Sequence, residues 1–138
     1  MEMPHVIEGA KKAGILDRFA NRSTLLAASM FESVPVDADA YIMKFIIHDW
    51  YDPECVKILS NCRKSIRPDG RLLVVDQVVP ARNQPGVAKL MDLEMLVLPG
   101  GMERTEKEFR DLFAASGFRL ERIIPTPALQ CIIEGVPV

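Results

Sequence analysis

Residues 72–79 constrain the fold of this chain more than any other segment, because they are almost continuously apolar and only Asp76 and Gln77 interrupt the run. A strand that is apolar on both faces belongs in the middle of a parallel sheet. Residues 38–47 form a second run of this buried type, interrupted by Lys44. The two runs therefore predict two strands of one parallel sheet.

A helix is expected between these two strands. Asp52 can cap its first turn, Pro53 suits its first helical position, and the sequence RPDG at 67–70 stops it with a turn. Thr105 and Glu108 form a capping box that starts a later helix. This capped helix is expected to end near residue 117. The other expected elements are helices over 6–13 and 84–98, a short strand over 24–29, and a hairpin-like pair of strands over 118–124 and 128–134.

This alternation of strands and helices predicts an α/β fold with a parallel sheet. Right-handed crossovers place the C-terminal ends of parallel strands at one edge of the sheet. Ligands of such sheets bind along that edge. Polar residues at the strand ends are therefore the first candidates for function.

The composition limits the class of protein. The 138 residues fit one domain, and 49% hydrophobic with 26% charged residues is typical of folded globular chains. A net charge of -2, without a run of five like charges, offers nothing that recruits nucleic acid or an anionic membrane. The apolar runs are too short to span a membrane, and residues 1–5 lack the pattern expected of a signal peptide. Cys55, Cys62 and Cys131 suit core positions of a cytoplasmic protein better than a disulfide framework.

Two side chains at the predicted strand ends could carry chemistry. His48 directly follows the 38–47 run, and an imidazole that titrates near neutral pH suits proton abstraction. A capping or structural histidine is an equally good interpretation. Asp76 lies near the end of the next strand, where a carboxylate beside an imidazole would orient it and stabilise its protonated form. The alternative is an ordinary residue of the loop after that strand.

Two further charged residues allow a functional and a simpler interpretation. Glu103 precedes the capped helix, where a carboxylate is favoured electrostatically without any other role. Gly100 and Gly101 permit unusual backbone angles that could aim Glu103 inward. Lys44 could extend from an exposed face of its strand or reach along the strand to a ligand.

Five segments follow the same order as the motifs of a known family. They are 3–7 (MPHVI), 44–50 (KFIIHDW), 55–62 (CVKILSNC), 68–76 (PDGRLLVVD) and 100–105 (GGMERT). Together they resemble the plant-type O-methyltransferases, which include the caffeic acid, isoflavone and hydroxyindole enzymes and their bacterial relatives. The resemblance covers essentially the whole chain, and an ordered set of motifs is far more specific than any single one.

The resemblance implies transfer of a methyl group from S-adenosylmethionine (SAM) to a hydroxyl, usually phenolic, of a small molecule. It implies a Rossmann-like sheet, mostly parallel with an antiparallel last strand, which suits the pair at 118–134. It also implies that His48 is the general base and that Asp76 and Glu103 are the carboxylates that flank it. No metal is expected, because this reaction needs an aligned oxygen and the removal of one proton.

The resemblance also implies a set of binding residues. The cofactor residues are Glu2 for the ribose, Ser29 and Met30 for the adenine, the strand lysine Lys44, and Trp50 beside the cofactor. Met95 falls in a helix that lines the acceptor pocket. Three positions depart from the commoner family pattern. Glu2 replaces an aspartate, Ser29 replaces an acidic residue, and Asp76 replaces the glutamate of many plant members.

Residues 1–138 correspond to the C-terminal part of the family's methyl-transfer domain. The family's glycine-rich loop and N-terminal dimerisation domain find no counterpart in this sequence. We therefore expect a truncated chain, a fragment or a degraded reading frame, and a full-length parent that is a homodimer. The first strands of the family's sheet are missing as well. The 41–47 strand is therefore expected to expose an unpaired edge, and the isolated chain is expected to be marginally stable.

Two other interpretations stay open. The chain could be a truncated, non-catalytic remnant that packs against a partner methyltransferase, in which case it should bind SAM poorly. It could also be a different nucleotide-binding α/β enzyme, such as a dehydrogenase. The hairpin-like ending at 118–134 argues against the dehydrogenase, because it suits the reversed last strand of the methyltransferase sheet.

Overall fold

The computed structural model describes residues 1–98 and 100–138, and its strands and helices alternate as expected. In chain order, with η for 3₁₀ helices, the elements are α1 (Pro4–Lys12), η1 (Asp17–Phe19), β1 (Ala38–Lys44), η2 (Ile47–Asp49), α2 (Asp52–Ser65), β2 (Ile66–Asp76), β3 (Val78–Val79), α3 (Ala88–Val97), β4 (Arg104–Thr105), α4 (Glu106–Ala115), β5 (Phe118–Pro125) and β6 (Cys131–Pro137).

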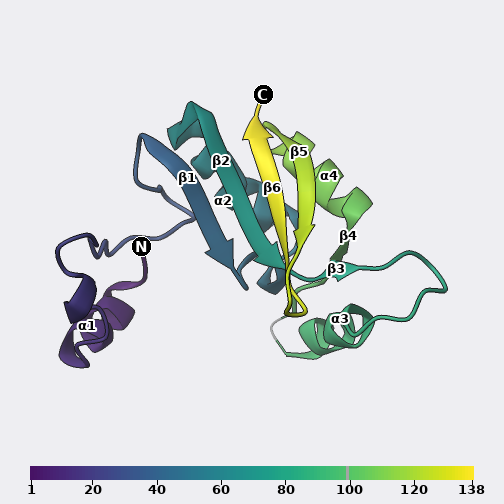
Figure 1. Ribbon diagram of the computed structural model, residues 1–138, viewed down its shortest axis with the longest axis horizontal. Helices are drawn as coiled ribbons and strands as arrows, with labels where there is room; N and C mark the ends of the chain where they lie inside the picture. Colours follow the sequence, from purple (N-terminus) through teal and green to yellow (C-terminus); the bar gives the residue numbers. More distant parts are fainter. Residues whose placement is uncertain (99) are drawn as a thin grey trace.

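The main sheet has four strands in the order β1-β2-β6-β5. β1 pairs in parallel with β2, and β6 pairs antiparallel with both of its neighbours. The strands β1, β2 and β5 consequently run in one direction and only β6 runs against them (Figure 1). This confirms the predicted α/β sheet with a reversed last strand. A second, two-stranded parallel sheet joins β3 to β4.

One face of the main sheet carries α2 and α4, and the hydrophobic core lies beneath them (Figure 1). Leu72 and Val74 of β2 are fully buried there against the apolar stripes of the two helices. Gly135 of β6 lies under the ring of Phe113, where an added Cβ would come within 2.8 Å of a ring carbon. The missing side chain at Gly135 therefore lets α4 pack closely on the sheet.

The three cysteines are free. Cys55 and Cys62 lie on the inner face of α2 with at most 1% of their surface exposed, as expected for small core residues, and Cys131 is half-buried. Burial raises the pKa of the Cys62 thiol to about 12. These thiols therefore stay protonated at neutral pH.

Three local predictions were wrong in detail. Residues 24–29 form no strand; Ala27 makes only an isolated bridge with Glu2. The expected turn at 67–70 lies within β2, where an irregularity in the pairing with β1 absorbs it. Asp52 does not cap α2: Tyr51 takes the N-cap position without a side-chain bond, and the Asp52 carboxylate pairs with Arg104 instead.

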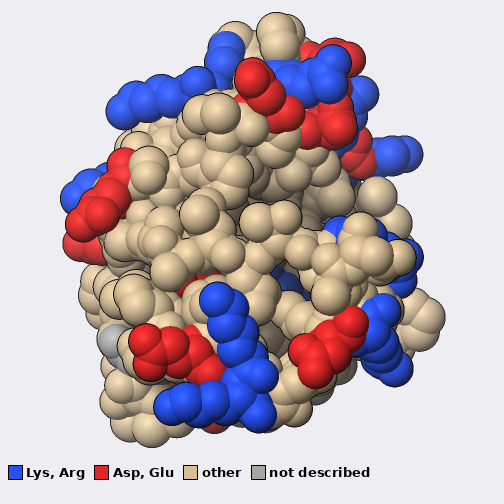
Figure 2. All heavy atoms as spheres, turned by 90° about the vertical axis from the view of Figure 1, so that its left-hand side faces the viewer, with Lys and Arg blue, Asp and Glu red and all other residues tan. Residues whose placement is uncertain are grey.

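β1 lies at the edge of the main sheet, as expected for the 41–47 segment. Ile42 in its middle is 70% exposed. Figure 2 shows this side of the molecule, where charged side chains of both signs gather toward the margin of a hollowed, largely uncharged surface. Of the helices that the structure describes, none has the length and apolar content to cross a membrane.

Candidate active site

The end of β1 turns sharply into the interior and places His48 there. Phe45 adopts a positive φ of 55°, and its amide donates a 3.2 Å hydrogen bond to Oδ1 of Asp76. This bend ends the strand at Lys44, three residues before the predicted end. The 3₁₀ helix η2 follows and carries His48, which is only 8% exposed.

His48 and Glu103 form the central contact of the site. Nδ1 of His48 lies 2.9 Å from Oε1 of Glu103, although 55 residues separate them in the chain. Both side chains are buried. An ionised carboxylate can only accept a hydrogen bond, so Nδ1 carries the proton and Nε2 of the neutral imidazole presents a lone pair. Nε2 has the carboxylate of Asp49 at 3.5 Å.

Asp76 lies at the C-terminal end of β2, with no exposed surface. Its Oδ1 accepts the amide of Phe45, so this carboxyl holds the bend that leads to His48. Oδ2 of Asp76 and Oε2 of Glu103 are both buried and have no hydrogen-bond partner among the described residues. The structure thus brings the three predicted residues together, with Glu103 in direct contact with the imidazole.

The electrostatics of the three groups are coupled. The hydrogen bond to Glu103 raises the pKa of His48 above its ordinary value, and the charges of Asp76, Glu103 and Asp49 act in the same direction, against the effect of burial. Burial raises the pKa of Asp76 to about 7, although the charge of His48 opposes this shift. His48 is therefore a stronger base than a free imidazole.

The glycine pair positions Glu103 in a way that the sequence indicated only in part. Gly100 adopts a φ of 81°, which agrees with the expectation of an unusual backbone angle. Gly101 matters for a different reason, because an added Cβ would overlap the carbonyl oxygen of His48. The next amide, of Met102, donates a 2.9 Å hydrogen bond to that same oxygen. Only glycine at 101 allows the two segments to approach this closely.

Sequence reasoning missed two residues that hold the site. Arg104 is buried to 1% exposure, and its guanidinium bonds to the carbonyl oxygens of Ile47 and Trp50. Asp92 of α3 accepts the amide of Glu103 at 2.9 Å. The only local signal was a charged residue beside Glu103, because the carbonyls of Ile47 and Trp50 lie more than fifty residues before Arg104 in the chain.

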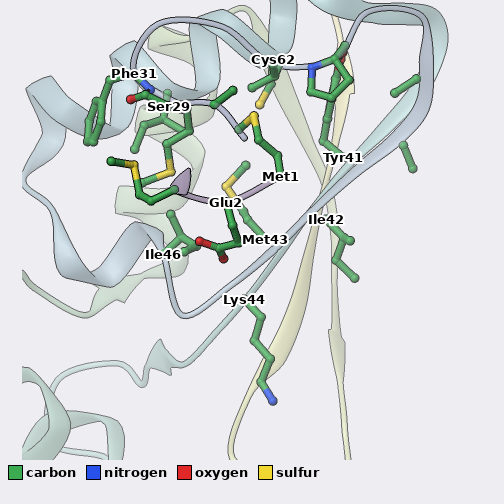
Figure 3. A pocket seen from close by; sticks show the side chains of 18 of the residues that line it. Met1, Glu2, Ser29, Phe31, Tyr41, Ile42, Met43, Lys44, Ile46 and Cys62 are labelled. Carbon is green, nitrogen blue, oxygen red and sulfur yellow. Dashed lines mark hydrogen bonds between the residues drawn. The ribbon is translucent and has the colours of Figure 1, made fainter. Parts of the chain in front are cut away.

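A cavity of about 730 Å³ lies next to the strand end, between β1 and the N-terminal segment. Figure 3 shows Glu2, Ser29 and Met43 around it. All five residues predicted to bind a cofactor line this one cavity: Glu2, Ser29, Met30, Lys44 and Trp50. Residues from three separate parts of the chain therefore meet at a single apolar hollow with one carboxylate.

Lys44, Trp50 and Met95 differ in how they lie relative to this cavity. Lys44 lines the cavity with its stem, while its ammonium points away and lies 4.9 Å from the ring centre of Phe45 (Figure 3). Trp50 packs edge-to-face against Phe31, with 4.8 Å between the ring centres. Met95 of α3 is buried and does not line this cavity; its carbonyl accepts the amides of Gly100 and Gly101.

Nε2 of His48 can accept a proton close to a cavity large enough for a ligand. Ile46 and Trp50 line the cavity, and His48 lies between them on the same turn. The imidazole is oriented from behind by a buried carboxylate, which stabilises the imidazolium that forms when Nε2 takes a proton. No group of three His, Cys, Asp or Glu side chains in the described part of the chain could hold a metal ion.

Comparison with known proteins identifies the family of this chain. Residues 1–119 match the model of the O-methyltransferase domain family. The chain is 43% identical over 141 residues to the phenazine O-methyltransferase PhzM of Lysobacter antibioticus, covering 99% of this chain and 40% of that protein. It is 40% identical over 129 residues to the mitomycin biosynthesis 6-O-methyltransferase of Streptomyces lavendulae, covering 93% of this chain and 36% of that protein.

Solved structures share the fold. The crystal structure of LaPhzM superposes with a TM-score of 0.92 at 42% identity, covering 99% of this chain and 41% of that chain. Human N-acetylserotonin methyltransferase in complex with SAM gives a TM-score of 0.88 at 28% identity, covering 99% of this chain and 39% of that chain. The chain spans about two fifths of the length of the curated relatives it matches. By sequence and fold, this chain belongs to the O-methyltransferase domain family.

Proposed function

We propose that this chain carries the base-bearing part of a SAM-dependent O-methyltransferase that methylates a hydroxyl, most simply a phenolic one, of a small molecule. The observation that supports this most is the 2.9 Å contact between His48 Nδ1 and Glu103 Oε1 at the end of β1. It supplies an oriented base on the turn whose neighbouring residues, Ile46 and Trp50, line the cavity.

In the proposed reaction, Nε2 of His48 takes the proton of the acceptor hydroxyl. Glu103 keeps the imidazole in the tautomer that leaves Nε2 free, and it stabilises the imidazolium after the transfer. Asp76 holds the bend at Phe45 and adds a second ionisable group that favours the protonated ring. SAM, when bound, supplies the electrophilic methyl group that the oxygen attacks.

The cavity beside β1 is the proposed cofactor site. The carboxylate of Glu2 suits hydrogen bonds from the two hydroxyls of a ribose, and the apolar walls around Ser29 and Met30 suit an adenine ring. Trp50 would close the site toward His48, and the stem of Lys44 would form its floor. Structural neighbours of this chain are described as bound to SAM or to S-adenosylhomocysteine, which supports this assignment.

The acceptor class is proposed from the names of the relatives. These proteins are named for phenazine, mitomycin and xanthohumol, and one neighbour was solved with a hydroxylated naphthoic acid. Each name denotes a small molecule with fused or linked rings, so we assign a compact hydroxylated ring compound to this chain. Met95 is proposed to lie near that acceptor, and the whole protein is proposed to act as a cytoplasmic homodimer.

A chimera tests the proposal without assuming how much of the domain this chain supplies. Residues 1–138 would replace the matching segment of the phenazine O-methyltransferase, to which they are 43% identical. The chimera should transfer a labelled methyl group from SAM to a hydroxylated phenazine. A folded chimera that binds SAM but transfers no methyl group to any acceptor in a phenolic panel would contradict the proposal.

A second candidate function rests on the exposed sheet edge. β1 has no described neighbour on its outer side, and Ile42 there is 70% exposed. A non-catalytic chain that packs this edge against a partner methyltransferase would use the same surface. Such a chain should bind SAM poorly by itself, so a micromolar dissociation constant for SAM, measured by calorimetry on the chain alone, would refute this candidate.

A further inference from the structure

Arg104 is the largest side chain that the structure buries completely, and nothing in the proposed reaction uses it. Its guanidinium donates hydrogen bonds of 3.0 Å to the carbonyl oxygens of Ile47 and Trp50. It also donates to Oδ1 of Asp52 at 2.7 and 3.0 Å. Burying a charge is costly unless it is paired and hydrogen-bonded; here Asp52 supplies the opposite charge, and the turn that contains His48 supplies the carbonyl acceptors.

The same turn is held from a second side by the backbone. The carbonyl of His48 accepts the amide of Met102, and Gly101 lies against that carbonyl without room for a side chain. The segment 101–104 therefore engages three carbonyl oxygens of the 47–50 turn, through one amide and one planar guanidinium fork. Glu103 lies between the two points of attachment, so its carboxylate is brought onto Nδ1 of His48.

We propose that Arg104 is a positioning residue: by holding the carbonyls on either side of His48, it fixes the contact between the imidazole and Glu103. It touches no reacting atom and acts only through these two residues. This inference rests on the proposed function, because the contact matters for turnover only if His48 is the base. The geometric claim can be tested without SAM or an acceptor.

Several charged groups face the imidazole and set its titration. Glu103 contacts Nδ1 from the loop before β4, Asp49 approaches Nε2 on η2, and Asp76 lies at the end of β2. The ring of Phe45 stacks on His48 at 5.4 Å, with the ammonium of Lys44 on that phenyl ring. The three carboxylates outweigh burial, so the pKa of His48 is raised.

The direction in which the pKa of His48 changes when Arg104 is removed distinguishes the possible roles of Arg104. If Arg104 acted only as a nearby positive charge, removing it would raise the pKa of His48. If it positions Glu103, removing it loosens the hydrogen bond that is the largest cause of the raised pKa, so the pKa falls. A purely structural role elsewhere in the fold would leave the pKa unchanged.

NMR titration of the histidine ring protons measures this shift directly. The chain has only two histidines, and the exposed His5 serves as an internal reference. The test variant is Arg104→Met. The matched control is Arg63→Met, which also removes an arginine that bonds two backbone carbonyls, those of Gly117 and Val138, far along the chain from the site.

We expect Arg104→Met to lower the pKa of His48, because it loosens the hydrogen bond from Nδ1 to Glu103, while Arg63→Met leaves that pKa unchanged. Glu103→Gln should produce a similar fall, and the double variant should fall no further than Glu103→Gln alone, because both changes remove one contact. An unchanged or raised pKa in a folded Arg104→Met variant, or fully additive shifts in the double variant, would overturn the proposal.

A second variant covers the case in which Arg104→Met does not fold. Arg104→Lys keeps the charge but replaces the fork by a single ammonium, which cannot reach both carbonyls and Asp52 together. Its circular dichroism should match wild type and its His48 pKa should still fall. An unchanged His48 pKa in this variant would overturn the positioning role of Arg104 and leave the proposed function standing. Conversely, an inactive chimera, together with the expected fall of the His48 pKa in the Arg104 variants, would overturn the proposed function and leave the positioning role standing.

Discussion

Asp76 should make the domain lose stability as the pH rises from 5 to 8. Its carboxyl has no exposed surface, and burial raises its pKa to about 7 in the folded chain. In the unfolded chain the same group titrates near its ordinary value of 3.8. Between these two values the folded state holds a proton that the unfolded state has lost, so the free energy of unfolding falls with increasing pH.

The magnitude follows from the two pKa values. One pKa unit corresponds to about 1.4 kcal/mol, and the interval from pH 5 to the folded pKa near 7 covers about two units. Asp76 alone should therefore remove about 3 kcal/mol of stability between pH 5 and pH 8. His48 acts in the same direction, because its raised pKa gives stability that is present below pH 6.5 and lost above its folded pKa.

Urea denaturation at pH 5, 6, 7 and 8 tests this reasoning. Asp76→Asn removes the titrating group but keeps an oxygen that can accept the amide of Phe45. Its stability should depend much less on pH, whatever constant cost the substitution carries. Asp69→Asn, at a side chain that is 86% exposed, should keep the wild-type dependence. A wild-type stability that is flat or rises from pH 5 to 8, or an unchanged slope in Asp76→Asn, would refute the account of Asp76.

Two further predictions concern local structure. Gly101→Ala should displace the loop from the His48 carbonyl and lower the urea midpoint more than Gly100→Ala does. A Cβ at Gly100 meets no atom within 4 Å, so Gly100→Ala should cost only about 1–2 kcal/mol for its positive φ. Equal urea midpoints for the two variants would contradict the close approach of Gly101 to the His48 carbonyl. Thr105→Ala should cost about 1 kcal/mol by removing the capping box of α4, measured the same way, and an unchanged midpoint would show that this cap adds nothing.

The parts of the fold that the sequence predicts best are those with local causes. The apolar run at 72–79 predicts a central strand, and most of that run lies in β2, which has a neighbour on each side. Thr105 and Glu108 predict the start of α4, because a capping box depends on residues three apart. Residues 24–29 also contain an apolar run but form only one bridge, because a strand also requires a partner with which to pair.

The site was predictable only in outline. Strand ends identified His48 and Asp76 as neighbours, because parallel strands share one carboxyl edge. The contact of His48 with Glu103 spans 55 residues, and it was expected only from the resemblance to the O-methyltransferase motifs, because no local pattern encodes it. Arg104 was missed for the same reason: an arginine in a polar stretch is expected to be exposed, and only the carbonyls of a distant turn make its burial possible.

The role of His48 is the central claim, and one comparison in the chimera tests it most directly. His48→Ala should lower the rate of methyl transfer at least about 100-fold, the usual contribution of a general base, while the dissociation constant for SAM stays unchanged in calorimetry. The rate should fall without a change in SAM affinity because the imidazole is hydrogen-bonded to Glu103 and does not line the proposed cofactor cavity. Methyl transfer at the unsubstituted rate with SAM still bound would contradict the assignment of His48 as the base.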